Sequence, residues 1–509
     1  MGHNRSHCQR SVGEPAGRPP LRRRPPVLET AARPRPALVV TFLSACALLV
    51  ALNQTLVVPL LPAFPQLLGT STATAAWLVS ITLVTGAVCA PVLGRLGDMH
   101  GKRRMLLVAL GLMTAGSAVG ALAPNIGVLI GARALHGAAL GVIPLGLSIL
   151  RDELPPDRVG GGIALVSSSL GIGNALGLPL TGAMAQFLGW RWLFGAVGVV
   201  SAVLFLLTRR VVGESPLRTG GRFDLPGAIG LGAALVCLLL AVSKGTEWGW
   251  TSPAILGLAV AAVVLFTAWG RYELRRSRPL VDLRVSARPA VLWTNVTSAL
   301  VGFALFASLM TSTQVLQAPV ATGYGFGQSL AVAGLLLLPI GVSMAVFSQV
   351  SAWLSRRRGP RTTLLVGTVV LVLGNAGMAA LPGRIPLVML AVAVIAAGTA
   401  LAYSALPLQL MAGVPRTETA AANSLNTLCR MLGTSSCSAV VAAVTSGLTM
   451  QVGGRTIPAG SAYTVLFGIA AAVAMAAVVV SALTAPRRAP VGTTAPGPAP
   501  AAFADERPG

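Results

Sequence analysis

Acidic side chains are scarce in this sequence, which has 14 Asp and Glu residues against 38 Lys and Arg residues in 509 positions. Charged residues of both signs make up 10% of the chain, whereas hydrophobic residues make up 54%. So few charges exclude a soluble multidomain protein and are typical of an integral membrane protein. Several acidic residues fall in connections or near the expected helix ends, namely Asp98, Asp152, Glu153, Asp224, Glu247, Asp282 and Glu418.

Patterns that bind metals or nucleotides are also missing from the sequence. The six cysteines are scattered and none forms a C-x-x-C pair, so we interpret them as small apolar packing residues. The phosphate-binding pattern G-x-x-x-x-G-K-[ST] does not occur, which argues against ATP as an energy source. No catalytic triad is recognisable either. We therefore expect no enzyme activity, no metal and no bound cofactor.

The net charge of +24 is carried mainly by arginines, which lie in every second connection between apolar runs. This alternation is the bias that keeps connecting loops on the cytoplasmic side of a membrane. A nucleic-acid-binding protein would instead need a basic groove with interleaved aromatic residues. The distribution therefore indicates a lipid bilayer as the partner and excludes nucleic acid.

Apolar runs of about 20 residues, each long enough to cross roughly 30 Å of hydrocarbon as a helix, recur from Ala37 to Leu483. No alternation typical of strands is recognised. The sequence therefore predicts an all-α, multi-pass protein of the cell membrane, and an even number of spans places both termini in the cytoplasm. The fourteen predicted spans are residues 37–61, 75–95, 105–123, 126–149, 162–187, 191–208, 226–243, 253–270, 291–312, 329–353, 363–381, 385–410, 421–446 and 461–484.

The longest basic connections flank the seventh and eighth spans, which predicts two six-helix bundles with a helical pair inserted between them. Two similar halves around a central cavity are a standard plan of secondary transporters, because rocking the halves exposes a midplane site to each side in turn. The predicted parts are a disordered cytoplasmic tail at 1–36, a first bundle at 37–210, connections with two inserted spans at 211–290, a second bundle at 291–484 and a cytoplasmic tail at 485–509.

The densest charge cluster between apolar runs is the stretch GRLGDMHGKRRM, from Gly94 to Met105. Asp98 can accept backbone N–H groups at a helix start or pair with a base, and Gly101 allows a tight turn. The bases that follow would anchor the third span at the cytoplasmic surface. Taken alone, the stretch could be such an anchor with one capping aspartate.

The stretch resembles the signature G-x-L-a-D-r-x-G-r-k of the major facilitator superfamily, and the fourteen-span plan is similar to its drug:proton antiporter branch. The matching residues are Gly94, Leu96, Asp98, Gly101, Lys102 and Arg103. The resemblance implies that all of these but Leu96 form a conformational latch, in which Asp98 binds a helix N-terminus and bases of the other half. Met99 replaces the usual arginine, so we expect a weaker charge relay.

The fourth span contains LIGARALHGAALG, which resembles the R-x-x-Q-G element of the same family. Arg133 and His136 would share a helical face, and an arginine buried in lipid should face a cavity or a partner. The resemblance implies that Arg133 takes part in proton handling; a structural hydrogen-bonding role is the alternative. His136 either replaces the hydrogen bonds of glutamine or carries a proton itself. Asp98 is the third candidate for proton coupling.

The fifth span contains GNALGLPLTG, which resembles the antiporter motif G-x-x-x-G-P-x-x-G-G. Small residues recur every four positions and form a ridge that another helix can approach closely, and Pro179 should bend the span. The likeness favours export, whereas helix packing without directional meaning is the alternative. The motif positions are Gly173, Gly177, Pro179 and Gly182.

Polar residues inside the spans are candidates for a substrate cavity. Asn53 stands where the family's first span usually has an acidic residue, and without buried carboxylates multiply charged cations become less expected substrates. Arg430 lies about 15 Å along its helix and could attract an anionic or zwitterionic substrate or bind carbonyl groups. The cavity candidates are Asn53, Gln54, Asn174, Gln317, Asn426 and Arg430.

Together the resemblance and the residues predict an exporter of amphipathic small molecules, such as drugs or antibiotics, with self-resistance among the roles that this activity allows. The resemblance implies exchange for protons, with the proton gradient as the energy source and a monomer as the working unit. An importer or facilitator of a small metabolite on the same fold is the alternative. A membrane enzyme or sensor is a third class, for which no site is recognisable.

Overall fold

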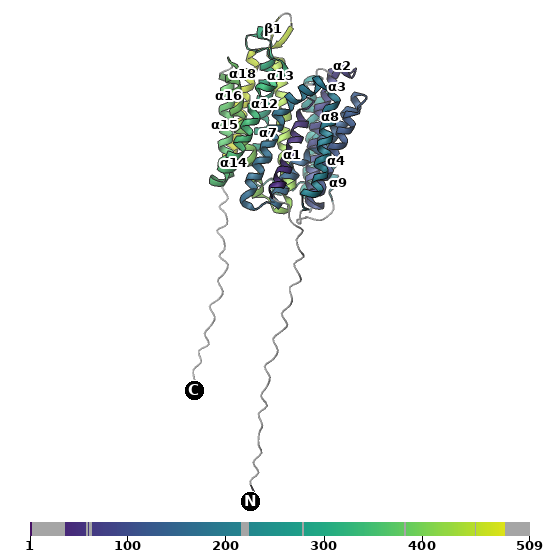
Figure 1. Cartoon of the computed structure of the whole chain (residues 1–509), viewed down its shortest axis with the longest axis vertical. Helices are drawn as coiled ribbons and strands as arrows, with labels where there is room; N and C mark the ends of the chain where they lie inside the picture. Colours follow the sequence, from purple (N-terminus) through teal and green to yellow (C-terminus); the bar gives the residue numbers. More distant parts are fainter. Residues whose placement is uncertain are drawn as a thin grey trace.

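A computed structural model describes residues 1–2, 36–57, 60, 64–214, 223–276, 279–380, 383–452 and 455–483. Long helices run side by side and form one helical body (Figure 1). Of the predicted tails, only residues 1, 2 and 36 are among those described, so the tails lie almost wholly outside them.

The first half of the chain forms a bundle of helices in which the fourth predicted span is divided. A single 3-10 turn, Ala139–Gly141, joins the two parts of that span. The helices are α1 (Pro36–Thr55), the short α2 (Phe64–Leu67), α3 (Thr72–His100), α4 (Lys102–Ala121), α5 (Ile126–Ala138), α6 (Val142–Glu153), α7 (Pro156–Phe187) and α8 (Trp190–Val211).

The second half repeats this plan after a pair of helices and a short connecting helix. Its tenth predicted span is divided into α13 and α14. The elements are α9 (Leu225–Trp248), α10 (Pro253–Arg275), α11 (Leu283–Ser286), α12 (Pro289–Gln317), α13 (Leu330–Leu336), α14 (Pro339–Arg358), α15 (Pro360–Ala380), α16 (Ile385–Gly413), α17 (Thr419–Gly447) and α18 (Gly460–Leu483).

Local sequence sets where many of these helices begin. Side chains of Ser71, Asn125, Ser252 and Ser329 accept a backbone N–H of the first turn and so cap α3, α5, α10 and α13. Proline, which lacks an N–H and has a helical φ, opens several others, including α12 and α14.

The predicted number of spans agrees with the structure. Among the described residues, thirteen helices are long and apolar enough to cross a membrane, counting α5 with α6 and α13 with α14 as single spans. The remaining predicted span is α7, which has 32 residues and packs against α1 and α14. The prediction of an all-α membrane protein with about fourteen spans is thus confirmed.

The two bundles meet mainly where α7 packs against α14 and where α3 packs against α17. Glycine permits both approaches: a Cβ at Gly171 would overlap the side chain of Met344, and a Cβ at Gly94 would lie 2.8 Å from the Ala420 carbonyl oxygen. One large apolar cluster fills the first bundle and extends to Met411, Leu428 and Met431 of the second, whereas another lies within the second bundle alone. These two contacts between α7 and α14 and between α3 and α17 are therefore the main places where helices of the two bundles lie close together.

The inserted helices lie beside the contact between α3 and α17. α9 packs against both of these helices, and α10 packs mainly against α9. On α10, Val260, Val263 and Val264 are 63%, 66% and 59% exposed, an apolar face that lipid would cover. The inserted pair thus follows the first bundle in sequence but touches both bundles in space.

A small hairpin between α17 and α18 was not predicted from the sequence. β1 (Thr449–Val452) pairs antiparallel with β2 (Arg455–Pro458), and the hairpin projects from one end of the bundle (Figure 1). The Tyr324 hydroxyl, in the connection after α12, donates to the Pro458 carbonyl over 2.6 Å. Four-residue strands are too short for an alternation to be distinguished from ordinary loop composition.

Candidate functional site

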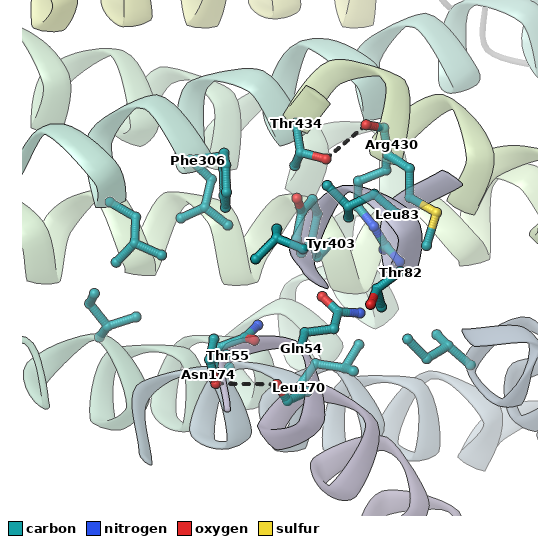
Figure 2. A pocket seen from close by; sticks show the side chains of 18 of the residues that line it. Gln54, Thr55, Thr82, Leu83, Leu170, Asn174, Phe306, Tyr403, Arg430 and Thr434 are labelled. Carbon is teal, nitrogen blue, oxygen red and sulfur yellow. Dashed lines mark hydrogen bonds between the residues drawn. The ribbon is translucent and has the colours of Figure 1, made fainter. Parts of the chain in front are cut away.

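A cavity of about 200 Å³ lies between the two bundles (Figure 2). Its walls come from α1, α3, α5, α6 and α7 on one side and from α12, α14, α16 and α17 on the other. Most of the lining is apolar, with amide and hydroxyl groups such as those of Gln54, Asn174 and Thr434. Two arginines line it, Arg133 and Arg430, and none of its described lining residues is Asp or Glu.

Arg430 reaches the cavity from α17, eleven residues beyond the start of that helix at Thr419. Its guanidinium carbon lies 5.1 Å from the ring centroid of Tyr403 on α16, within the range of a cation–π contact. Within the described part of the chain, its side chain has no hydrogen bond or ion pair. A Cβ at Gly302 on α12 would lie 3.0 Å from the Arg430 Cγ, so glycine there leaves room for the arginine.

Arg133 lines the opposite side of the cavity, but two of its three nitrogen atoms, Nε and Nη1, donate to protein oxygens. Its Nε donates to the Leu78 carbonyl over 3.2 Å, and its Nη1 donates to the Asn53 carbonyl over 3.0 Å and to the Asn53 Oδ1 over 3.2 Å. The residue is only 1% exposed. These neutral acceptors tie α5 to α1 and α3, and they account for the burial of the positive charge.

His136 lies one turn further along α5 and does not line the cavity. Its Nε2 is 2.9 Å from the Ser117 Oγ on α4, and its ring stacks on Phe194 of α8 with centroids 5.9 Å apart and planes at 5°. Its Nδ1 is 3.5 Å from Nη1 of Arg133. The imidazole is thus a buried hydrogen-bonding group among three helices of the first bundle.

The structure separates the predicted cavity residues into two groups. Gln54, Asn174 and Arg430 line the cavity, and in Figure 2 Gln54 and Tyr403 project into it from opposite sides. Asn53 contacts Arg133 instead.

Gln317 and Asn426 also lie outside the lining of this cavity. The Gln317 amide donates to the Thr313 carbonyl within α12. The Asn426 amide donates to Asn295 Oδ1 over 2.9 Å, and its Oδ1 accepts from Ser298 over 3.3 Å. Asn426 therefore joins α17 to α12 inside the second bundle, because that side of α17 packs against α12 rather than facing the other bundle.

Asp98 lies at the contact between the bundles, in the last turn of α3. Its carboxylate accepts the backbone N–H groups of Ala420 over 3.3 Å and Ala421 over 2.9 Å, at the start of α17. The helix N-terminus favours a negative charge at this position. Asp98 is fully buried, so this contact is shielded from water and salt.

Lys102 joins a second acidic residue to the same contact. Its Nζ lies 2.8 Å from Asp152 Oδ2, 3.4 Å from Thr419 Oγ1 and 3.8 Å from Asp98 Oδ1. The chain can turn from α3 into α4 between these groups because Gly101 has φ +113°. Asp98, Lys102 and Asp152 of the first bundle thus meet the first residues of α17 in one buried cluster, which we call the latch cluster.

The other two residues of the predicted latch have different surroundings. Gly94 lets α3 approach Ala420 and Ser424 of α17 closely, next to the latch cluster. Arg103 donates instead to the Arg209 carbonyl at the end of α8, within its own bundle. Met99, which replaces the usual arginine of the signature, is buried.

The glycines of the predicted antiporter motif let α7 pack against α1. A Cβ at Gly173 would lie 2.6 Å from the Leu48 carbonyl oxygen, and a Cβ at Gly177 would overlap the Thr55 side chain. The α7 helix continues through Pro179 and Gly182, whose surroundings lie outside what the structure describes. The ridge therefore brings two cavity-lining helices together at cavity depth.

Comparison with known proteins gives the family of this fold and site. Residues 43–436 match the family model of the Major Facilitator Superfamily. The chain belongs to the Major Facilitator Superfamily. The resemblance seen in the charged turn is thereby confirmed, and the protein is a multi-pass membrane protein of a transport family rather than an enzyme family.

Relatives of this major facilitator protein carry names that refer to resistance and export. It is 29% identical over 356 residues to the tetracenomycin C resistance and export protein of Streptomyces glaucescens, an alignment that covers 69% of this chain and 64% of the relative. It is 29% identical over 371 residues to the multidrug resistance protein Stp of Mycobacterium tuberculosis, covering 72% of this chain and 68% of that protein.

A solved structure supports the fold independently. The human organic anion transporter MFSD10 (TETRAN) superposes with a TM-score of 0.62 and 18% sequence identity, covering 88% of this chain and all of that one. At this identity the likeness concerns the fold alone.

Three residues of this major facilitator site were not singled out as site residues from the sequence. They are Tyr403 beside Arg430, and Asp152 and Thr419 beside Lys102. Asp152 offered a signal, because it is an acidic residue in the basic connection after the fourth span. Tyr403 and Thr419 offered none, since their partners lie on other helices.

Proposed function

We propose that this protein is a proton-coupled exporter of amphipathic small molecules, including drugs or antibiotics, that works by alternating access as a monomer in the cell membrane. The observation that carries the proposal is the cavity between two bundles that are joined through the latch cluster. A site between two halves can be exposed to either side when one half rocks against the other. The names of the relatives support export as the direction.

The orientation of the protein in the membrane follows from the distribution of its basic residues. The basic connections, including the one that holds Lys102 to Arg104, lie at the cytoplasmic surface by the positive-inside bias, which places both termini there as well. The latch cluster then closes the cytoplasmic side of the cavity. Opening towards the cytoplasm requires that the Asp98 carboxylate leave the N-terminus of α17.

Of the three candidates for proton coupling, Asp98 has the most direct connection to movement. A proton on its carboxylate would remove the charge that attracts Lys102 and the two N–H groups of α17, and so would weaken the contact that joins the bundles. Arg133 is held by neutral oxygens, and His136 contacts Ser117 and Phe194 away from the cavity. We therefore assign the coupling to Asp98, with the proton gradient as the energy source.

Transport in inverted membrane vesicles tests the proposal. Vesicles that hold the protein are acidified inside, and amphipathic anions, neutral compounds and cations are added while a pH-sensitive dye reports the interior. We expect a substrate to accumulate inside the vesicles and to release protons from them, because export in the cell corresponds to uptake here. Movement of substrate out of the vesicles would show import, and accumulation without proton release would exclude proton exchange.

A further inference from the structure

Arg430 is the one cation of the cavity lining whose guanidinium has no hydrogen-bond acceptor among the described residues. A charged side chain at this depth in a membrane is costly and normally pairs with another group. Arg133, the other arginine of the lining, is compensated in this usual way, because three protein oxygens accept hydrogen bonds from its Nε and Nη1. The donors of Arg430 are therefore available to a ligand.

Tyr403 positions the guanidinium without using its donors. The ring of Tyr403 lies 5.1 Å from the guanidinium carbon, within the range of a cation–π contact, and no described residue accepts a hydrogen bond from the guanidinium. The N–H groups point outward from the edge of the planar guanidinium and form a fork that matches the two oxygens of a carboxylate. No described residue accepts these N–H groups, so the fork is available to an oxyanion.

The rest of the lining defines the remainder of the ligand. Apolar side chains of both bundles line the cavity, Leu83 and Leu170 from the first bundle and Phe306, Ile340 and Met344 from the second. The hydroxyls of Thr55, Thr82 and Thr434 already donate to carbonyls of their own helices. The amides of the lining belong to Gln54 and Asn174, which carry no charge and have no hydrogen bond from their side chains to any described residue. A ligand with an apolar body and one anionic group would match the apolar lining, the uncharged amides and the guanidinium of Arg430.

We propose that the cavity binds amphipathic organic monoanions, with a carboxylate or sulfonate on the guanidinium of Arg430 and the hydrophobic body against the apolar wall. This assignment rests on the proposed function in that it takes the cavity as the transport site. A cation is disfavoured at the same place, because two arginines and no described carboxylate surround it.

Three probes with one shape and different charges test the assignment: 1-naphthylacetate, the neutral 1-naphthylacetamide and the cationic 2-(1-naphthyl)ethylammonium. Binding of each to the purified full-length protein is measured by calorimetry in detergent at neutral pH. We expect wild-type protein to bind the anion at least tenfold more tightly than the cation, with the neutral probe between them. Equal binding of the three probes, or preference for the cation, would overturn the assignment without any variant.

Variants at Arg430 identify the group responsible. Arg430→Gln should weaken binding of the anion about tenfold, the usual size of a charge-assisted hydrogen bond, while binding of the neutral probe stays within about twofold. Arg430→Lys should recover part of the loss, because the charge remains but the planar fork does not. The matched control is Arg384→Gln, which removes an exposed arginine from the connection before α16.

The outcomes of these measurements distinguish the assignment from the export proposal. Weaker binding of the anion alone in Arg430→Gln supports the assignment. Equally weaker binding of the anion and the neutral probe in this variant, or weaker binding of the anion in Arg384→Gln, contradicts it. If the anion binds through Arg430 but no probe or compound moves in vesicles, export fails and the binding site stands. If vesicles accumulate cations and the anion does not bind, the site assignment fails and export stands.

Discussion

At the scale of single residues, Asp98 shows how one carboxylate can hold two helical bundles together. It accepts two backbone N–H groups of α17 and lies 3.8 Å from Lys102, and the side chains of Asp98 and Lys102 are both buried. Removing the charge should weaken each of these attractions by about 1 kcal/mol. The contact should then form less often during the transport cycle.

We expect Asp98→Asn to lower proton-coupled transport about tenfold while the protein still inserts and folds. Asparagine keeps one oxygen acceptor, but its NH₂ group would face the N–H groups of Ala420 or Ala421 and could not accept from them. Initial flux in vesicles at matched expression checks the result. Asp157→Asn is the control, because this side chain at the start of α7 is 76% exposed; flux of Asp98→Asn equal to that of wild type would contradict the role.

His136 leads to the opposite expectation. Glutamine at this position can keep a hydrogen bond to Ser117, although it loses the ring stacked on Phe194. His136→Gln should therefore change transport by less than about threefold and lower the melting temperature by a few degrees. Substrate exchange measured without a proton gradient should change no more than proton-driven transport does. A large loss of proton-driven transport with normal exchange would instead identify His136 as the proton carrier.

At the scale of elements, glycines decide how closely α7 and α1 can pack. Gly173→Ala would place a Cβ 2.6 Å from a backbone oxygen of α1, which cannot move aside without shifting the helix. We expect a loss of about 1–3 kcal/mol in stability together with reduced transport. Gly161→Ala is the control on the same helix, because nothing lies within 4 Å of the added Cβ. Melting temperatures in detergent compare the two; an equal effect of both variants would exclude close packing as the cause.

The helices are also the feature that the sequence predicts best. The length of the apolar runs and the alternation of arginines predict the spans, because the thickness of the bilayer limits helix length and charge limits orientation. The signature around Asp98 marks the turn that meets α17. Helix periodicity places Asn426 and Arg430 on one side of the same helix. In the structure, however, Asn426 contacts α12 and Arg430 lines the cavity. How α17 packs against its neighbours makes that distinction, and spacing in one sequence cannot show it.

At the scale of the whole molecule, the charge of the substrate determines how the membrane potential acts on transport. Export of a monoanion in exchange for protons moves one more positive charge inward per cycle than export of a neutral molecule. Each charge that crosses 100 mV contributes about 2.3 kcal/mol. An interior that is negative, as in a living cell, therefore favours export of an anion more than export of a neutral molecule.

This dependence is measurable in proteoliposomes with a potential set by potassium and valinomycin. Where the protein is oriented for export, we expect the flux of 1-naphthylacetate to rise more steeply with the potential than that of 1-naphthylacetamide, because one further charge crosses with it. Empty liposomes correct for passive permeation, and Asp98→Asn should reduce both fluxes about equally since it changes the latch and not the cargo. Anion flux that rises with the potential no more steeply than the flux of 1-naphthylacetamide would mean that the anion crosses as its neutral acid, in which case Arg430 would have no charge to bind during transport.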